Sequence, residues 1–543
     1  MTHNFGTLDG IVIIGYLVGV LMLGFYYSRR SNKSMEDYFL TGRNLTWLGV
    51  GMSLFATNIS SEHFVGLAGS GASRGLAVGQ FELMAIFILI ILGWFLSPIY
   101  IKSGVVTMPE FIEKRYDSRS RKIFTIISIV VYLFTKVSVT LFAGGILFYK
   151  IFGINIYASA IIIVLMTGIY SVIGGSYAVM KTQIVQAFMM LLGAFLLTIY
   201  GLAEVGGFSA LQEKLPTEYF QMFKPIDDPD VPWTGIIFGA PIIAFWYWCA
   251  DQYIVQRVLS ARSIDDARRG SLLAAFLKIT PIFVLVLPGM IAYALFPGLQ
   301  GDEAFPILIA SNILPAGIKG FVLAAVLAAV MSSLASVFNS TASLITNDFY
   351  KPKNPTASEE KLVLVGRLST MVIVVTAIMC VPLVKLISSQ LYLYMQNIQA
   401  TISPPITAVF IFGLFLKKAN AKGALWTLII GELIGLTKLT ADFLVRFEIV
   451  NNPSLIALAN INFLHFAIFS FIASSFLLVV ISYMYNEKAE LSNSKLQLLF
   501  SENIKEIGYG LSHLKTSVLT YRVNVFFSIF ILMIIIGLWS LWF

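Results

Sequence analysis

The chain has 543 residues, of which 57% are hydrophobic and 12% charged, and its formal net charge is +8. A soluble domain typically carries about 25% charged residues, so the polar surface that several soluble domains would need is missing. This composition disfavours a soluble enzyme, a nucleic-acid binder and a disordered protein. It predicts an all-α polytopic membrane protein with the lipid bilayer as the solvent for most of its surface.

Apolar stretches long enough to cross about 30 Å of hydrocarbon recur from one end of the chain to the other. We expect about fourteen transmembrane helices in one transmembrane domain, residues 1–543. Their predicted limits are 8–28, 46–71, 78–101, 123–149, 156–175, 183–203, 233–250, 270–296, 317–347, 363–385, 392–416, 423–442, 457–485 and 523–542.

The basic residues fall mostly in alternate connections between these stretches, namely those that follow the odd-numbered ones. By the positive-inside rule, this alternation predicts that both termini face outward and that the number of spans is even. The inner connection 486–521 mixes charge with Leu and Phe, which is typical of an interfacial helix on the cytoplasmic side. The outer connections carry no N-glycosylation sequon and no cysteine, which favours the plasma membrane of a bacterium, its inner membrane.

The second stretch contains polar side chains where they would be costly in lipid. The run 53–64 reads SLFATNISSEHF, and glycines follow at 66, 69 and 71. Close packing of helices through small residues is one interpretation. A broken helix that lines a cavity explains both the glycines and the polar cluster, and it is our prediction. The seventh stretch ends in Trp246, Tyr247 and Trp248, which suit either an interfacial belt or stacking on a sugar ring.

The ninth stretch carries Ala329, Ser332 and Ser333 at spacings that put them on one helical face. Hydroxyl and freed carbonyl oxygens suit an alkali or alkaline-earth cation, although serine hydroxyls also link helices by hydrogen bonds. Glu82, Lys136 and Lys278 lie deep in apolar stretches, so we interpret them as cavity residues or a buried pair. No pattern of metal-spaced histidines or paired aspartates predicts an enzyme.

Five segments together resemble the sodium:solute symporter family, and within it the sodium/glucose (galactose) cotransporter branch. These segments are 58–69, 98–110, 246–257, 332–340 and 413–418. The resemblance implies a leucine-transporter-type fold with two inverted five-helix repeats, residues 46–203 and 233–416. The second and seventh stretches would then be the discontinuous helices.

The resemblance also implies two sites. Sodium would be bound by the backbone carbonyls of Ala56, Ile59 and Ala329 together with the hydroxyls of Ser332 and Ser333. A sugar would be bound by Asn58, His63, Glu82, Tyr247, Trp248, Lys278 and Gln396, with Tyr247 as the inner gate. Glu82 and Lys278 would offset each other in charge, which suits a neutral sugar.

The sequence departs from the family pattern after the fifth stretch. The family commonly has an aromatic-Thr-Asp run there, whereas this chain has Met180-Lys181-Thr182-Gln183. Because Gln183 replaces an aspartate linked to sodium coupling, we expect one Na⁺ per sugar. Ala244 also stands where relatives often have a polar sugar contact, which weakens a choice of glucose over another polyol.

The implied function is sodium-coupled import of a neutral monosaccharide of the glucose or galactose type. The alternatives are a symporter for myo-inositol, another polyol or sialate, and an uncoupled sugar-gated sensor or channel on the same fold. A monomer and a homodimer both remain open.

Overall fold

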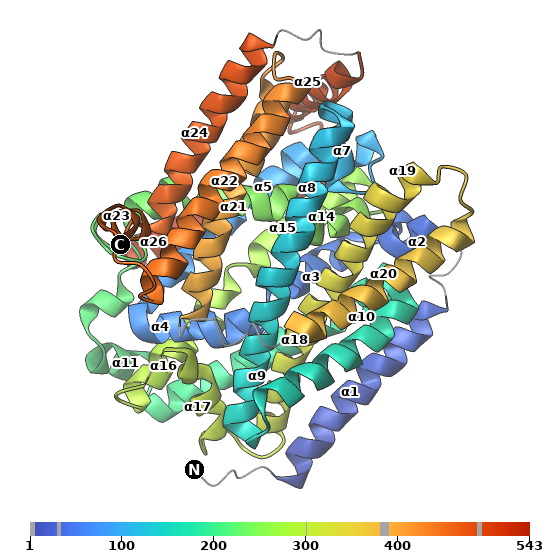
Figure 1. Cartoon of the computed structure of the whole chain (residues 1–543). Helices are drawn as coiled ribbons and strands as arrows, with labels where there is room; N and C mark the ends of the chain where they lie inside the picture. Colours follow the sequence, from blue (N-terminus) through green and yellow to red (C-terminus); the bar gives the residue numbers. More distant parts are fainter. Residues whose placement is uncertain (1–5, 30–33, 300, 381–389, 486–490) are drawn as a thin grey trace.

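The protein is described here by a computed structural model that covers residues 6–29, 34–299, 301–380, 390–485 and 491–543 (Figure 1). Within these residues the regular secondary structure is helical, and the β pairings are two isolated bridges, Leu45–Ala261 and Lys224–Pro232. The predicted all-α class is therefore confirmed.

Long helices form the body of the molecule, several of them built from consecutive segments. Their bounds are α1 (Thr7–Ser28), α3 (Trp47–Asn58), α5 (Gln80–Ile91), α6 (Ser97–Ser103), α8 (Ser118–Val131), α9 (Ser138–Phe152), α10 (Ile156–Val205), α15 (Ile264–Leu277), α16 (Leu287–Leu295), α18 (Ile318–Leu344), α20 (Glu359–Cys380), α21 (Leu391–Phe415), α22 (Ala421–Arg446), α24 (Phe463–Met484) and α26 (Leu519–Leu541). Shorter helices in the connections include α2 (Met35–Leu40), α7 (Met108–Arg115), α11 (Phe208–Lys214), α17 (Ala304–Ala310), α19 (Lys351–Lys353) and α23 (Pro453–Ala459).

The predicted count of about fourteen spans is not confirmed. In the described residues, eleven helical segments are long and apolar enough to cross a membrane. One of them, α10, contains both predicted stretches 156–175 and 183–203, as two helices that meet at Gly175, where the backbone angles are not helical (φ 52°, ψ −157°). A side chain could not replace this glycine, since Tyr38 lies 2.7 Å from the position of a Cβ. The helix α22 covers the predicted stretch 423–442 but is not among the eleven. The last residues of stretch 363–385 lie outside the described part.

The first broken helix lies where the sequence predicts it. The helix α3 ends at Asn58, and Ile59 is extended (φ −73°, ψ 111°) before the chain resumes in the π-helical turn η2 (Glu62–Leu67) and α4 (Ala68–Arg74). The Ser60 hydroxyl accepts the N–H of Glu62 at 3.2 Å and so caps the new start. The break exposes the last carbonyls of α3, which have no helical partner.

The second broken helix follows the aromatic run. The segments α12 (Trp233–Phe238), α13 (Ala240–Phe245) and the π-helical turn η7 (Trp246–Ala250) lead to Asp251, which is extended (φ −75°, ψ 120°). The helix α14 (Gln252–Leu259) then starts, and the Asp251 carboxylate caps it by accepting the N–H of Tyr253. Both discontinuities expected from the resemblance are thus present.

At the centre of the bundle lies α18, which is almost completely buried and packs against α1, α3 and α10. Its sequence is rich in Ala and Ser, and small side chains allow helices to approach closely in a membrane. This packing brings the Ser332 and Ser333 hydroxyls against the broken end of α3.

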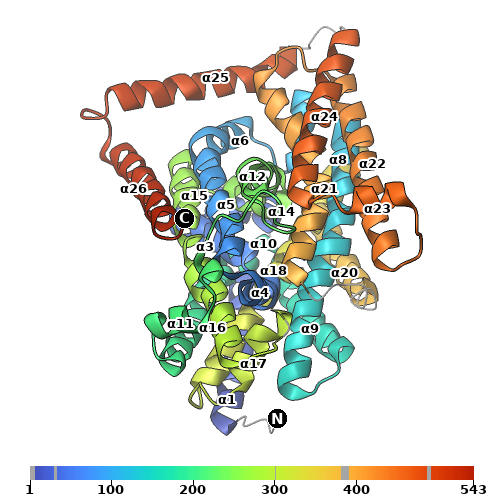
Figure 2. The ribbon, with the colours of Figure 1, turned by 90° about the vertical axis from the view of Figure 1, so that its left-hand side faces the viewer.

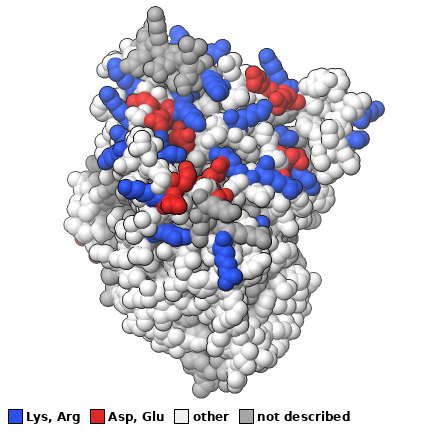
Figure 3. All heavy atoms as spheres, turned by 90° about the vertical axis from the view of Figure 1, so that its right-hand side faces the viewer, with Lys and Arg blue, Asp and Glu red and all other residues white. Residues whose placement is uncertain are grey.

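Charged side chains are unevenly distributed over the molecule. Figure 3 shows Lys, Arg, Asp and Glu gathered at one end, while the other end of this face is nearly free of them. The helix α25 (Leu491–Ser512), which forms most of the predicted connection 486–521, lies across the charged end and joins α24 to α26 (Figure 2). Residues 486–490 of that connection lie outside the described part.

Candidate solute and ion sites

A cavity of about 50 Å³ lies where the two broken helices meet α5, α15 and α21. All seven residues predicted for the sugar site line it: Asn58, His63, Glu82, Tyr247, Trp248, Lys278 and Gln396. Nine lining residues were not predicted for the site: Glu62, Phe81, Ala85, Ala240, Ile243, Ala244, Tyr392, Met395 and Gln399. The structure therefore brings together polar groups that are up to 338 positions apart in the chain, counted from Asn58 to Gln396.

A buried charge pair forms one wall of this cavity. The Lys278 ammonium pairs with the Glu82 carboxylate and donates to Asn58 Oδ1 at 2.7 Å. The other oxygen of Glu82 accepts the Tyr392 hydroxyl at 2.9 Å. Glu82 and Lys278 are both almost inaccessible, and such charges are tolerated only when they are paired and hydrogen-bonded. The predicted offset of the two charges matches this geometry.

His63 adds a neutral donor to the same wall. Its Nδ1 accepts the backbone N–H of Ser60 at 3.4 Å, so the proton of a neutral ring lies on Nε2. Nε2 is 3.7 Å from Glu82 Oε1, and the ring meets Tyr392 edge to face at 5.6 Å between centroids. An imidazole N–H of this kind can donate to a ligand hydroxyl.

Aromatic rings also line the cavity. The Tyr247 hydroxyl accepts from Asn58 Nδ2 at 3.1 Å, which ties one broken helix to the other. Trp248 meets Tyr247 edge to face at 5.2 Å between centroids, and the Lys278 ammonium lies 5.6 Å from the Trp248 ring. The cavity thus combines aromatic rings with hydrogen-bonding groups, which suits a sugar.

Three of the lining residues come from one face of α21. Tyr392, Gln396 and Gln399 follow one another at spacings of four and three, so they share a helical face. Only Gln396 was predicted. The polar stripe in an otherwise apolar helix was a signal that could have identified the other two.

The predicted sodium residues lie beside this cavity, at the broken end of α3. The Ser332 hydroxyl donates to Ala56 O at 2.7 Å and to Ala329 O at 3.0 Å. The Ser333 hydroxyl donates to Thr57 O at 3.3 Å, and Ile59 is the extended residue at the break. These hydroxyl and carbonyl oxygens are hard ligands that fit Na⁺. In the described residues, no group of three His, Cys, Asp or Glu offers an alternative metal site.

Gln183 lies next to these oxygens, on α10. Its Nε2 donates to Thr57 Oγ1 at 3.1 Å, to Ser332 O at 3.2 Å and to Ser336 Oγ at 2.7 Å. Its Oε1 accepts the Ser53 hydroxyl. The neutral amide therefore satisfies a cluster of hydroxyl and carbonyl oxygens beside the predicted ion site.

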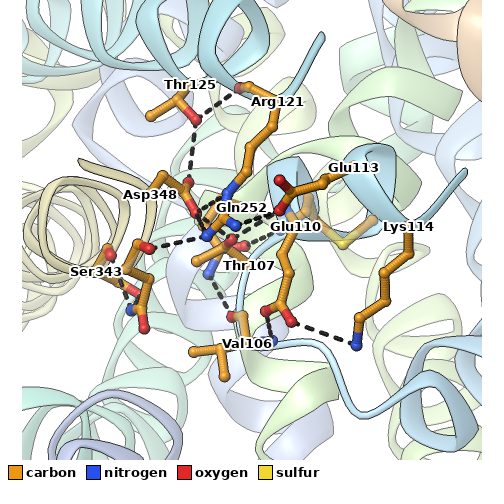
Figure 4. Close-up of polar contacts among 12 residues, drawn as sticks. Val106, Thr107, Glu110, Glu113, Lys114, Arg121, Thr125, Gln252, Ser343 and Asp348 are labelled. Atoms are coloured by element: carbon orange, nitrogen blue, oxygen red, sulfur yellow. Dashed lines mark hydrogen bonds and ion pairs between the residues drawn. The ribbon is translucent and has the colours of Figure 1, made fainter. Parts of the chain in front are cut away.

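A polar network joins α7, α8 and the end of α18 (Figure 4). Arg121 on α8 bonds to the Asp348 carboxylate at 2.7 and 3.0 Å, and Thr107 and Thr125 donate to the same carboxylate at 2.8 and 3.1 Å. Asp348 belongs to the π-helical turn η10 (Ile345–Tyr350) that follows α18. This network links the α7–α8 region to the end of the helix that carries Ser332.

A buried carboxyl group lies beside the first residue of α21. Asp302 accepts the N–H of Leu391 at 3.0 Å, one residue before Tyr392. Burial raises the pKa of Asp302 to about 8, although this hydrogen bond lowers it. At neutral pH the carboxyl is therefore mostly protonated and adds little charge to this end of the helix.

The chain matches the family model described as "Sodium:solute symporter family" over residues 38–431. It belongs to the sodium:solute symporter family. Among curated proteins, it is 38% identical to sodium/glucose cotransporter 2 of Rattus norvegicus over 523 residues, which is 87% of this chain and 78% of that protein. It is 37% identical to sodium/myo-inositol cotransporter 2 of Bos taurus over 514 residues, 87% of this chain and 76% of that protein.

The fold of this symporter is found in solved structures. The substrate-bound, outward-open structure of a Na⁺-coupled sialic acid symporter superposes with a TM-score of 0.76 at 23% identity, covering 90% of this chain and all of that one. This likeness agrees with the leucine-transporter-type fold expected from the sequence. The chain is thus a multi-pass membrane symporter with Na⁺ as its coupling ion.

Proposed function

We propose that this symporter imports a neutral monosaccharide of the glucose or galactose type together with Na⁺, by alternating access. The observation that carries the proposal is the cavity, which is lined by aromatic rings and by a neutralised set of donors and acceptors. The relatives named as sodium/glucose cotransporters support the same substrate class.

The two binding sites share one short segment of backbone. Ala56 and Ile59, proposed for the ion, flank Asn58, proposed for the sugar, at the break after α3. When Na⁺ binds, the Ser332 hydroxyl turns its oxygen to the ion, and the ion replaces its proton as the partner of Ala56 O. This change stabilises the break in one conformation and so holds Asn58 in place for a hydroxyl of the sugar.

The cavity must enlarge before it can hold its ligand. A volume of about 50 Å³ is room for only a few water molecules. In our mechanism the bundle rocks around the site, so the cavity opens outward for sugar and ion and then inward past Tyr247. We propose the limits of the two rocking repeats as residues 46–203 and 233–416, each of which contains one of the broken helices.

One Na⁺ per sugar is our proposed stoichiometry, supported by the amide of Gln183 among the oxygens beside the ion site. Moving one charge through the membrane potential is worth about 2.3 kcal/mol per 100 mV. A tenfold sodium gradient adds about 1.4 kcal/mol, so one ion can concentrate a neutral sugar a few hundred-fold.

A polyol such as myo-inositol is the second candidate substrate. Ala244 presents a methyl group to the cavity where a polar contact would favour a hexose, and a myo-inositol cotransporter is among the relatives. An anionic sugar such as sialate is disfavoured, because Lys278 is already paired with Glu82 and because Glu62 adds another acidic group to the lining.

The decisive experiment is uptake of labelled glucose, galactose, myo-inositol and sialate into proteoliposomes with an imposed sodium gradient. We expect sodium-stimulated uptake of a hexose, and loss of that stimulation in Ser332→Ala and Ser333→Ala. The matched control is Ser470→Ala, a buried serine of α24 that does not line the cavity. Sodium-independent uptake would indicate a sugar-gated channel, and no uptake of any sugar or polyol would refute the substrate class.

The membrane orientation belongs to the same proposal. We place the charged end of Figure 3 in the cytoplasm of a bacterium, at its plasma membrane, with both termini outside. The start of α1 lies at the opposite end of the molecule from α25 (Figure 2), which supports this placement for the N-terminal side.

A further inference from the structure

Lys136 is a buried lysine that neither site has so far explained. It lies in the π-helical turn η5 (Tyr132–Val137) between α8 and α9, and it is 3% exposed. Its ammonium makes no hydrogen bond within the described residues. Instead it lies over the rings of Tyr247, Tyr253 and Trp246, at 3.9, 4.5 and 5.9 Å from their centroids. A buried cation without hydrogen bonds is costly, so this aromatic cage, together with a long ion pair to Asp251, holds it in place.

The ion pair between Lys136 and Asp251 is longer than a hydrogen bond. Asp251 Oδ2 is 3.8 Å from Lys136 Nζ, which is too far for a hydrogen bond, and it has no other partner in the described part of the chain. The other oxygen of Asp251 is already used, because it accepts the Tyr132 hydroxyl and the N–H of Tyr253. A shift of about 1 Å would therefore move the cation from the ring of Tyr247 to a free carboxylate oxygen.

The two closest rings of the cage lead to the two binding sites. The Tyr247 hydroxyl accepts from Asn58, which lines the sugar cavity. The Tyr253 hydroxyl donates to Thr57 O at 2.5 Å, and the same carbonyl accepts the hydroxyl of Ser333. Lys136 thus touches one ring tied to the sugar site and one ring tied to the ion site.

We propose that Lys136 is a positioning residue that couples the ion site to the inner gate. While the ammonium lies on the Tyr247 ring, the gate is held shut. When it passes to Asp251, the ring is released and the inner path can open. Tyr253 determines which partner the ammonium takes. The Tyr253 hydroxyl shares the Thr57 carbonyl with the Ser333 hydroxyl, and the Ser333 hydroxyl turns away when Na⁺ binds. The inference rests on the proposed function for the roles of Tyr247 and Ser333.

The first test compares substitutions that keep and remove the charge. In Lys136→Met we expect sodium-independent sugar flux to rise about thirtyfold, the change that corresponds to losing one desolvated cation–π contact. Coupled sites typically change each other's affinity about 5- to 150-fold. In Lys136→Met we expect the effect of Na⁺ on sugar affinity to fall below about twofold. Lys136→Arg should restore both properties.

Asp251→Asn should have the opposite effect. It keeps the cap of α14, since Asn caps helices as well as Asp, but it removes the charge that receives the ammonium. We expect slower turnover without leak. The matched control is Lys438→Met, which removes another buried lysine from an ion pair, with Asp442 on α22. A leak or a loss of coupling in Lys438→Met as large as in Lys136→Met would overturn the specific role of Lys136.

A second measurement does not depend on the sugar. Hydrogen–deuterium exchange of residues 246–259 in nanodiscs, with Na⁺ or with K⁺, reports whether the ion site reaches the gate. We expect a sodium effect in the wild-type protein and in Lys136→Arg, and none in Lys136→Met. An equal sodium effect in Lys136→Met, or no effect in the wild-type protein, overturns the inference. If the wild-type protein transports no sugar, the proposed substrate fails while this measurement still decides the role of Lys136.

Discussion

The amide of Gln183 lies among the hydroxyl and carbonyl oxygens of Ser53, Thr57, Ser332 and Ser336. Its N–H groups point the positive end of the amide dipole at these oxygens, which are atoms that also suit a cation. The side chain carries no net charge, so it cannot contribute to the charge moved in each cycle. A single residue thus determines whether the oxygens beside the ion site hold an ion or an amide.

We therefore predict that Gln183→Asp creates a second cation site. The shorter carboxylate leaves space among hard oxygen ligands and adds the charge that an ion needs. The ratio of charge to sugar, measured by electrophysiology on a solid-supported membrane together with labelled uptake, should rise from one to two. Gln183→Asn, which shortens the side chain without adding charge, is the control. An unchanged ratio in Gln183→Asp contradicts the prediction.

The sequence was sufficient to predict part of the site, for reasons that differ between residues. Asn58 and His63 stood out because polar groups inside an apolar stretch are costly without a purpose. Lys136 was noticed for the same reason, but its cage could not be predicted. Its partners Tyr247 and Tyr253 are more than a hundred positions away, and no spacing within a helix encodes such a contact.

At the scale of elements, glycine determines how closely two helices can pack. A Cβ on Gly289 of α16 would lie 1.8 Å from Ala68 O and 2.9 Å from Ala72 N, both on the backbone of α4. The neighbouring atoms belong to main chain, so they cannot move aside as a flexible side chain would. The second half of the first broken helix is thus held directly against α16.

We expect Gly289→Ala to destabilise the protein by about 1–3 kcal/mol, as overpacking of a filled core typically does. The thermal-unfolding midpoint in detergent should fall by several degrees. Gly15→Ala is the control, because no atom lies within 4 Å of a Cβ at that position on α1. Equal midpoints for the two variants would show that α4 and α16 can separate without cost.

The network around Asp348 joins two other elements. Breaking a buried ion pair by removing one charge costs about 3–5 kcal/mol, since the remaining charge is left uncompensated. We predict that Asp348→Asn weakens the contact between α8 and η10 and increases the inward-open population at least about tenfold. Labelling of a single cysteine placed below Tyr247, from the cytoplasmic side, measures this population.

Lys102→Gln is the matched control for Asp348→Asn. Lys102 pairs with the exposed Glu506 at 3.1 Å, and such a surface pair contributes at most about 1 kcal/mol. Labelling should therefore be unchanged in this variant. Equal labelling in Asp348→Asn and the wild-type protein would mean that the network does not hold the cytoplasmic side closed.

The boundary between two predicted stretches lies at a glycine. Stretches 156–175 and 183–203 were predicted as separate helices, and α10 consists of two helices that meet at Gly175, where the backbone angles are not helical. Only glycine adopts the backbone angles found there, yet the chain has 41 glycines and most of them do not interrupt a helix. The packing of Tyr38 against this position, which requires the glycine, is a long-range contact that the sequence does not reveal.

At the scale of the whole molecule, the charged end and the nearly uncharged end define an orientation (Figure 3). In a background without the two buried cysteines, Cys249 and Cys380, we predict that Asp227→Cys reacts with an impermeant thiol reagent added to intact cells. Thr356→Cys, near the charged end, should react only after permeabilisation. Both positions are exposed, so reactivity reports sidedness rather than burial. The reverse pattern would invert the proposed topology.

The helix α25 has a mechanical consequence. Near its start, Gln497 donates to Gly413 O and Leu416 O at the end of α21. Six residues later, Asn503 donates to Trp94 O and Phe95 O, just before α6. Six residues of helix span only about 9 Å and do not stretch. Any separation of α21 from α6 must therefore break one of these two clamps, so α25 acts as a strap that limits how far these helices can separate at the charged end of the molecule.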